Sequence, residues 1–233
     1  MSISYSVRRH PRARRLKLRV RRDGSVQVTA PKRACRSGIQ AFVDEAGPWI
    51  RQRRAALDAQ RLPAAERGPF PARLRLDAIG QLLPVTYATA DTARWRFGRD
   101  ALAIALVERQ PDAARRLLVD ALKSLADRAL TPRLLEWAER GKLRPSSVRW
   151  RNQKSRWGSC SSRGGISLNV RLLFLEPDVV DYVLVHELAH LDHPDHSPAF
   201  HARVASLLPR AGVLRRRLRT AGARVPDWIL EET

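Results

Sequence analysis

The chain has 233 residues, of which 44% are hydrophobic, so it is long and apolar enough to bury a core, and this excludes a disordered protein. Its longest apolar run, residues 101–107, is far shorter than the ~20 residues of a membrane-spanning helix, and we expect no membrane partner. Residues 1–13 contain no apolar segment of the kind found in signal peptides, which predicts a cytoplasmic protein with reduced cysteines.

The chain is strongly basic, with 44 Lys and Arg against 23 Asp and Glu and a formal net charge of +21. Residues 1–61 carry sixteen of the cations and four of the acids, so +12 of the net charge lies in this part of the chain. Such a field attracts nucleic acids and other anionic partners. The codon usage of a GC-rich genome explains the abundance of Arg and Ala equally well, so both interpretations of the basic charge stay open.

Residues 15–30 predict a β-hairpin. Apolar residues on one face alternate with cations on the other, and Asp23 with Gly24 provides the turn. The favoured interpretation of the cationic face is a solvated surface, and a phosphate-binding ribbon is the alternative.

A helix is predicted over residues 37–59, with Gly47 and Pro48 kinking it or splitting it in two. Short β-like runs follow between residues 73 and 107, and together with the hairpin they predict a small antiparallel sheet or partial barrel. We therefore assign residues 1–108 to a basic, β-rich N-terminal part with one helix.

The rest of the chain, residues 109–233, predicts a second domain of helices and strands. Residues 111–140 form the clearest helical pattern, residues 148–157 and 166–173 have the pattern of strands, and residues 177–193 predict an apolar helix. The fold class that we expect is α+β, with a β-rich N-terminal part and a C-terminal helix-and-sheet domain.

Five of the six histidines fall between residues 186 and 201, and the motif His186-Glu187-Leu188-Ala189-His190 lies on the predicted apolar helix. Positions four apart lie one turn up the same helix face, so the rings of His186 and His190 can reach one metal ion. Glu187 is rotated by roughly 100° from His186 and can take a proton from a water beside the metal. Zn²⁺ lowers the pKa of such a water toward ~7 and polarises a carbonyl, so the motif predicts hydrolysis of an amide. A buried helix that carries histidines by chance is the alternative.

Tetrahedral zinc with one open position needs a third protein ligand, and His193 and His196 compete for that place. On a continued helix, His193 would lie about 10 Å along the axis from His186, a span that zinc bonds of ~2.1 Å cannot bridge. Pro194 should end the helix, after which the chain can turn back and present His196 from a loop. A Ser-Pro pair follows and predicts the start of a new helix that holds the loop, so His196 is the favoured ligand.

Other polar residues near the motif are candidates for supporting roles. Asp192 and Asp195 are expected to accept hydrogen bonds from the imidazoles. Asn169 and Tyr182 are candidates for hydrogen-bond donors to the transition state. Cys160 is expected to be a small buried residue, with a metal or redox group as the alternative.

Several segments resemble the YgjP-like metallopeptidase domain family, which is related to the SprT-like and WLM-type zincins. They are RWGSCS at residues 156–161, the strand-like residues 166–169, HELAH at residues 186–190 and HSPAF at residues 196–200. The resemblance covers most of the chain and implies a zincin-like C-terminal domain with His186, His190 and His196 as zinc ligands and Glu187 as general base. It also implies a zinc-dependent peptidase, and a UTP-hydrolysing activity is proposed for the family.

The leading prediction is therefore a zinc metallopeptidase that acts on a peptide or protein substrate, with a sheet edge beside the metal to bind an extended peptide. Two alternatives stay open. One is a metal-dependent hydrolase of nucleoside triphosphates such as UTP. The other is a non-catalytic nucleic-acid-binding module with structural zinc, which would need a fourth ligand such as His193 or Cys160.

Overall fold

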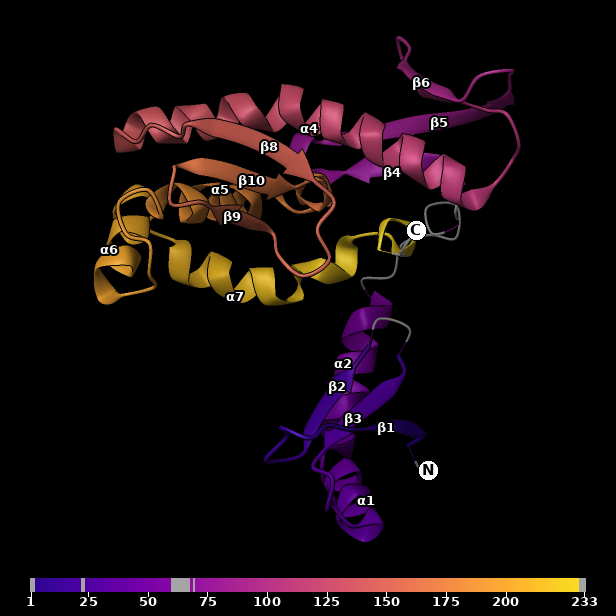
Figure 1. Ribbon diagram of the computed structural model, residues 1–233, viewed down its shortest axis with the longest axis vertical. Helices are drawn as coiled ribbons and strands as arrows, with labels where there is room; N and C mark the ends of the chain where they lie inside the picture. Colours follow the sequence, from indigo (N-terminus) through magenta and orange to yellow (C-terminus); the bar gives the residue numbers. More distant parts are fainter. Residues whose placement is uncertain (1–2, 22–23, 60–67, 69, 231–233) are drawn as a thin grey trace. The chain divides into compact units, whose positions relative to one another are not determined.

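The computed structural model describes residues 3–21, 24–59, 68 and 70–230. Within these residues it contains six α-helices and three small sheets (Figure 1). Each sheet combines parallel and antiparallel strand pairs. The α+β class expected from the sequence is confirmed. None of the helices in this part of the chain combines the length and the apolarity needed to cross a membrane.

The chain divides into two compact units, Met1–Arg61 and Leu62–Thr233. The sequence analysis placed the boundary between residues 108 and 109 instead, and that position lies inside the second unit. The physical reason is a shared core, because strand residues before this position, such as Leu102 and Ile104, are buried in the same cluster as residues of the helices that follow.

The N-terminal unit consists of a three-stranded sheet and two helices (Figure 1). The strands are β1 (Tyr5–Arg9), β2 (Lys17–Val20) and β3 (Val26–Ala30), in the order β1-β3-β2. β2 and β3 pair antiparallel, which confirms the predicted hairpin, and β1 adds a parallel strand that the sequence analysis missed. Alternate residues of β3 are buried against α1 (Arg36–Glu45) and α2 (Gly47–Ala59), and the core of the unit consists of Val26, Val28, Ala30, Ile39, Val43 and Ile50.

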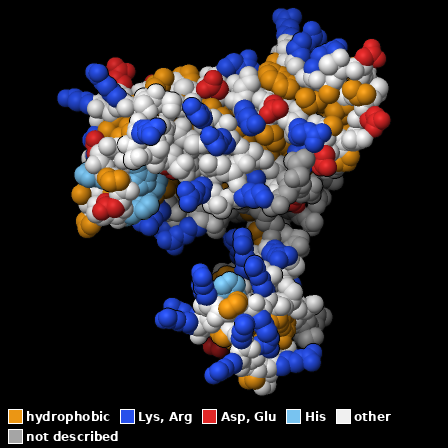
Figure 2. Space-filling view, viewed as in Figure 1, with side chains coloured by type: hydrophobic (Ala, Val, Ile, Leu, Met, Phe, Trp, Pro, Cys, Tyr) orange, Lys and Arg blue, Asp and Glu red, His pale blue; other side chains and the backbone are white. Residues whose placement is uncertain are grey.

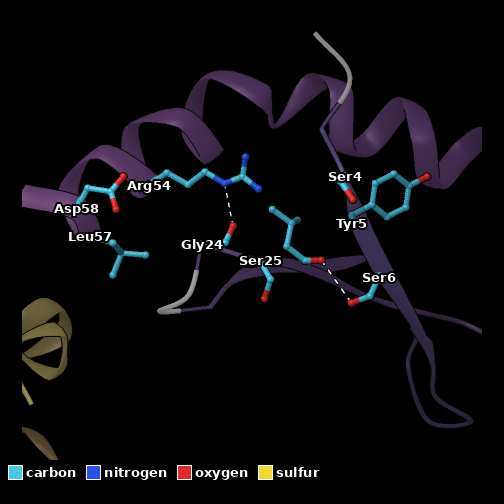
Figure 3. Close-up of a pocket in the computed structure, with 9 residues that line it drawn as sticks. Ser4, Tyr5, Ser6, Gly24, Ser25, Arg54, Leu57 and Asp58 are labelled. Carbon is cyan, nitrogen blue, oxygen red and sulfur yellow. Dashed lines mark hydrogen bonds between the residues drawn. The ribbon is translucent and has the colours of Figure 1, made fainter. Parts of the chain in front are cut away.

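The helix predicted over residues 37–59 is split into α1 and α2. Pro48 lies in the first turn of α2, where its missing N–H leaves no helical bond unmade. Arg54 of α2 donates from Nε to the carbonyl of Gly24 at 2.8 Å and ties the helix to the chain between β2 and β3, where Asp23 of the predicted turn lies outside the described residues. A hollow of about 600 Å³ surrounds this bond (Figure 3), and its lining includes Ser4, Ser25, Leu57 and Asp58.

The C-terminal unit begins with a separate sheet. Its strands are β4 (Arg73–Leu76), β5 (Gln81–Thr89), β6 (Arg94–Phe97) and β7 (Leu102–Leu106), in the order β4-β5-β7-β6. The predicted β-like runs are confirmed, but the expected single sheet or barrel with the first hairpin is wrong, because the hairpin pairs only with β1 among the described strands. Helix α4 (Pro111–Gly141) contacts β6 and β7, so this sheet packs on the helix that also supports the histidine motif.

Helix α5 (Pro177–Ala189) lies in the interior of the C-terminal unit. It contacts α4, α6 (Pro198–Leu207) and α7 (Ala211–Ala221), and its hydrophobic residues are buried around most of its circumference. A helix that is apolar on all sides is stable only when other elements surround it. The histidine motif therefore sits on one of the most enclosed helices of the unit.

A third sheet covers α5 on the side of the motif. It consists of β8 (Ser147–Arg151), β9 (Gly158–Cys160) and β10 (Gly165–Asn169), in the order β8-β10-β9. β9 lies between residues 148–157 and 166–173, the two stretches predicted as strands from the sequence. It pairs antiparallel with β10 and contacts α5, so an edge strand lies against the helix that carries the histidine motif.

One partly buried polar contact fixes α5 against α4. The carboxylate of Asp181 accepts hydrogen bonds from Arg133 at 2.6 and 2.7 Å and from the indole N–H of Trp137 at 2.8 Å. A bidentate Arg–carboxylate pair has a defined geometry as well as a favourable energy. This contact sets the position of α5 a little more than one turn before the first motif histidine.

Candidate metal centre

Three histidine rings meet at the C-terminal end of α5. His186 lies in its last turn, His190 at its C-cap, and His196 in the segment that leads to α6. One ring nitrogen of each residue lies within 4.8 Å of the other two, and the Nε2 atoms of His186 and His196 are 3.2 Å apart. Two ligands at ~2.1 Å from a tetrahedral zinc ion would be about 3.4 Å apart, so this spacing suits a shared metal. Figure 2 shows histidine side chains gathered on the C-terminal unit.

The chain reverses between α5 and α6 through local hydrogen bonds. The helix ends at Ala189, earlier than the predicted end at His193, and the N–H of His193 donates to the carbonyl of Ala189 at 3.0 Å. Ser197 then caps α6 by accepting from the N–H of Phe200, with proline at the start of the helix as predicted. These two ends bring His196 back toward the helix, while the side chain of His193 is not part of the cluster.

The surroundings of the rings favour neutral imidazoles with a free Nε2. Nδ1 of His190 lies 3.0 Å from the carbonyl of His193, so it must carry the hydrogen, and this leaves the Nε2 lone pair for a metal. Burial lowers the pKa of His186 to about 4, with further lowering by the neighbouring His190 and His196. Burial also lowers the pKa of His190. Nδ1 of His186 is buried and has no hydrogen-bond partner among the described residues.

The ring of Phe200 packs against all three histidine rings. Its ring centroid lies 4.5 Å from that of His190 in a stacked arrangement, and 4.9 Å from those of His186 and His196. The side chain is fully buried in α6. No role for Phe200 was predicted from the sequence, although its place in the first turn of the predicted helix, just after His196, was a signal that it lies near that ring.

Glu187 is buried beside the cluster, with 5% of its surface exposed. Its carboxylate lies against the backbone of β9, where a Cβ atom on Gly158 would lie 2.7 Å from both Cγ and Oε1 of Glu187. Only glycine leaves room for the side chain at that point. Burial raises the pKa of Glu187 to about 7, and the positive charge of Arg156 opposes the rise.

The histidines and Glu187 open into a cleft of about 580 Å³. One wall is built from small residues of β9 and the following turn, and the lining includes Gly158, Ser159, Cys160, Ser161, Ser162 and Gly164. β9 is the outer strand of its sheet order, so one of its backbone edges is not paired with a described strand. Cys160 is half-buried and lies outside the three-histidine cluster, and burial raises the pKa of its thiol.

The two aspartates expected to orient the imidazoles bind other groups. Asp192 accepts from Nε of Arg203 at 2.9 Å, and Asp195 accepts from the backbone N–H of Ser197 at 3.2 Å. Arg203 also donates to a carbonyl at the end of α4. Both carboxylates therefore stabilise the turn between α5 and α6, and the carbonyl of His193 orients His190 in their place.

The two candidate donors to the transition state, Asn169 and Tyr182, have structural contacts in the fold. Asn169 is buried and donates to the carbonyls of Gln153 and Arg156 at 2.8 Å each, so it holds the chain that leads into β9. Tyr182 is 5% exposed and lies one turn before His186, with ring centroids 5.8 Å apart. Asn169 thus positions one wall of the cleft, and Tyr182 packs behind a motif histidine.

Comparison with known proteins shows the family of the chain. The family model for the YgjP-like metallopeptidase domain matches residues 14–221. The search of curated proteins gave no match. Among solved structures, the chain is similar to the crystal structure of the metallopeptidase zymogen of Pyrococcus abyssi abylysin, with 31% identity over 37% of this chain and 89% of that chain and a TM-score of 0.35. The family match includes both the predicted hairpin and the three clustered histidines, and the chain belongs to the YgjP-like metallopeptidase domain family.

Proposed function

We propose that this chain is a zinc-dependent peptidase in which His186, His190 and His196 hold the metal and Glu187 is the general base. The observation that carries the proposal is the convergence of three ring nitrogens within 4.8 Å, next to a buried carboxylate in an open cleft. The family implies a divalent metal. Three imidazole ligands with an open position suit catalytic zinc in particular.

The three residues fit zinc in their chemistry as well as their spacing. The tautomer of His190 leaves its Nε2 free, and burial keeps His186 neutral. Zinc bound there would supply a Lewis acid that acidifies a water and polarises a carbonyl. The remaining steps belong to side chains and backbone of the protein.

Glu187 is the residue that we assign to proton transfer. It follows His186 directly on α5, and its carboxylate is packed against β9 with little exposure to water. We infer that it accepts a proton from the attacking water and passes that proton to the leaving amide nitrogen. A positioned carboxyl group with this double role contributes ~10²- to 10⁴-fold to the rate.

The edge of β9 suits a peptide in extended conformation. Strand addition would supply backbone hydrogen bonds along one wall of the cleft, and these do not depend on side-chain identity. The small side chains that follow Gly158 leave space above the wall. We therefore propose that the substrate is a peptide or an unfolded protein segment bound as an added strand.

The other two interpretations receive less support from described contacts. A structural zinc site needs four protein ligands, and neither His193 nor Cys160 joins the three-histidine cluster among the described residues. A nucleoside triphosphate would need several cationic or backbone phosphate contacts, and Arg156 is the only Lys or Arg among the described residues that line the cleft. The peptidase is therefore the function that we put forward.

The test combines metal content with turnover. Metal bound per chain would be measured by mass spectrometry on protein purified without a histidine tag, and turnover with a library of quenched fluorescent peptides. We expect one zinc per chain and cleavage that stops on chelation and returns with added zinc. A protein that binds zinc but cleaves no peptide, while hydrolysing UTP, would contradict the proposal and favour the nucleotide interpretation.

A further inference from the structure

The N-terminal unit has a sheet face that its two helices do not cover. Strand register places two cross-strand rows on this face: Ser6, Gln27 and Arg19 form one row, and Arg8, Thr29 and Lys17 form the other. The residues that alternate with them, such as Val26 and Val28 of β3, are buried in the core of the unit. We call the six residues of the two rows the basic outer face.

The charges on the basic outer face have one sign. Arg8, Lys17 and Arg19 are exposed, and each row has an uncharged polar residue of β3 between its outer members. The described acids of this unit lie elsewhere, because Asp44 and Glu45 are on α1 and Asp58 is on α2. Figure 2 shows blue Lys and Arg side chains spread over the N-terminal unit.

These cations differ from arginines of the same unit that have structural roles. Arg9 donates to the carbonyls of Pro31, Lys32 and Ala34, and Arg54 donates to a carbonyl across the hollow of Figure 3. Within the described residues, no ion pair or hydrogen bond engages the side chains of the three cations of the basic outer face. Their guanidinium and ammonium groups are available to an external anion.

We propose that the basic outer face binds the phosphodiester backbone of a nucleic acid. Lys17 and Arg19 are two residues apart on one strand, about 7 Å, and Arg8 lies two strand spacings away from Lys17, roughly 10 Å. The three cations thus form a triangle that several phosphates of one backbone can contact together, with Thr29 and Gln27 as hydrogen-bonding groups between them.

The chemistry of the two rows separates a nucleic acid from other anionic partners. They contain no aromatic residue on which a base could stack, so binding should depend on phosphates and not on sequence. They also contain no apolar residue that could enter a lipid bilayer, which disfavours an anionic membrane. This inference concerns a different unit from the metal cluster and stands independently of the peptidase proposal.

The experiment uses the full chain and two short labelled DNA duplexes of unrelated sequence, with binding followed by fluorescence anisotropy over a range of salt. The test variant is Arg8→Gln, Lys17→Gln and Arg19→Gln together. Loss of three phosphate contacts should reduce the slope of log K against log salt by about 2.7 and weaken binding on the order of 100-fold at ~0.15 M salt. Both duplexes should bind the wild type equally.

The matched control is Arg94→Gln, Arg96→Gln and Arg99→Gln, which removes the same charge from exposed positions of the other unit. It should keep wild-type affinity within about twofold, because it leaves the basic outer face intact. Equal weakening by both triple variants, or no weakening by the first, would overturn the proposal. Binding to phosphatidylserine vesicles without binding to duplex would do the same. If circular dichroism shows that the triple variant is unfolded, the single variants Arg8→Gln and Lys17→Gln replace it. Each should change the slope of log K against log salt by about 0.9.

Discussion

Substitution of Gly158 by alanine tests whether the close packing of β9 positions the base. The added Cβ would lie 2.7 Å from Cγ and from Oε1 of Glu187 and 2.8 Å from its Cδ. Carbon atoms in contact lie ~3.5–4.0 Å apart, so the carboxylate or the strand must move by about 1 Å. A displacement of that size at a reacting group costs on the order of 100-fold in rate. We therefore expect Gly158→Ala to lower kcat by about that factor.

The assay compares kcat on a quenched fluorescent peptide with zinc content and thermal unfolding. The zinc content of Gly158→Ala should equal that of the wild type, because the clash involves Glu187 and not the histidines. Gly212→Ala is the matched control, since no neighbouring atom of the described residues lies within 4 Å of the corresponding Cβ on α7, and alanine there should stabilise the helix by about 0.5–1 kcal/mol with unchanged kcat. Wild-type kcat in Gly158→Ala would refute the placement of Glu187 against β9 as a determinant of turnover.

The remaining predictions concern the metal cluster and its supports. Glu187→Gln should keep one zinc per chain and lose ~10²- to 10⁴-fold in kcat, as measured by mass spectrometry and peptide cleavage. His196→Ala should lose the metal at zinc concentrations where His193→Ala retains it, because His196 belongs to the three-histidine cluster and His193, among the described residues, does not. Phe200→Ala should lower the free energy of unfolding by about 3–5 kcal/mol in urea and weaken zinc affinity, since its ring packs on all three histidines. Asp181→Ala should lower the free energy of unfolding by about 2 kcal/mol, because it removes the carboxylate that accepts from Arg133 and Trp137 of α4.

Each of these predictions has a contrary outcome. Retained metal in His196→Ala together with its loss in His193→Ala would reverse the assignment of the third ligand. Asp120→Ala, which removes an exposed pair with Lys123, should change the free energy of unfolding by no more than about 0.5 kcal/mol, and an equal effect of Asp181→Ala would contradict the anchoring role of that carboxylate. Unchanged zinc affinity in Phe200→Ala would limit its role to packing.

Much of the candidate site follows from local sequence. The four-residue spacing of His186 and His190 needs only helix geometry, and the return of His196 needs only the helix stop before Pro194 and the new start at Ser197. Both signals act within a few residues, so they do not depend on the rest of the fold. The structure brings together the three rings that this reasoning selected, although the helix ends a few residues earlier than predicted.

Other parts of the site depend on contacts between distant segments. β9 consists of Gly158, Ser159 and Cys160, which have little intrinsic strand preference, and it forms because β10 and α5 offer it partners. The expected bonds of Asp192 and Asp195 to the imidazoles were wrong. Arg203, on the helix after the turn, donates to Asp192, whereas Asp195 accepts from the N–H of Ser197 in a local turn two residues along the chain.

The sequence by itself determined the α+β class, the cationic hairpin, the helix of the histidine motif and the return of His196 toward that helix, because each rests on periodicity, turn residues or spacing within one segment. Only the tertiary structure decided that strands β4 to β7 share a core with the helix of the histidine motif, that Gly158 makes room for Glu187, and that Phe200 packs against the three rings. These features arise from packing between residues far apart in the chain, where burial and shape select the partner and local propensity does not.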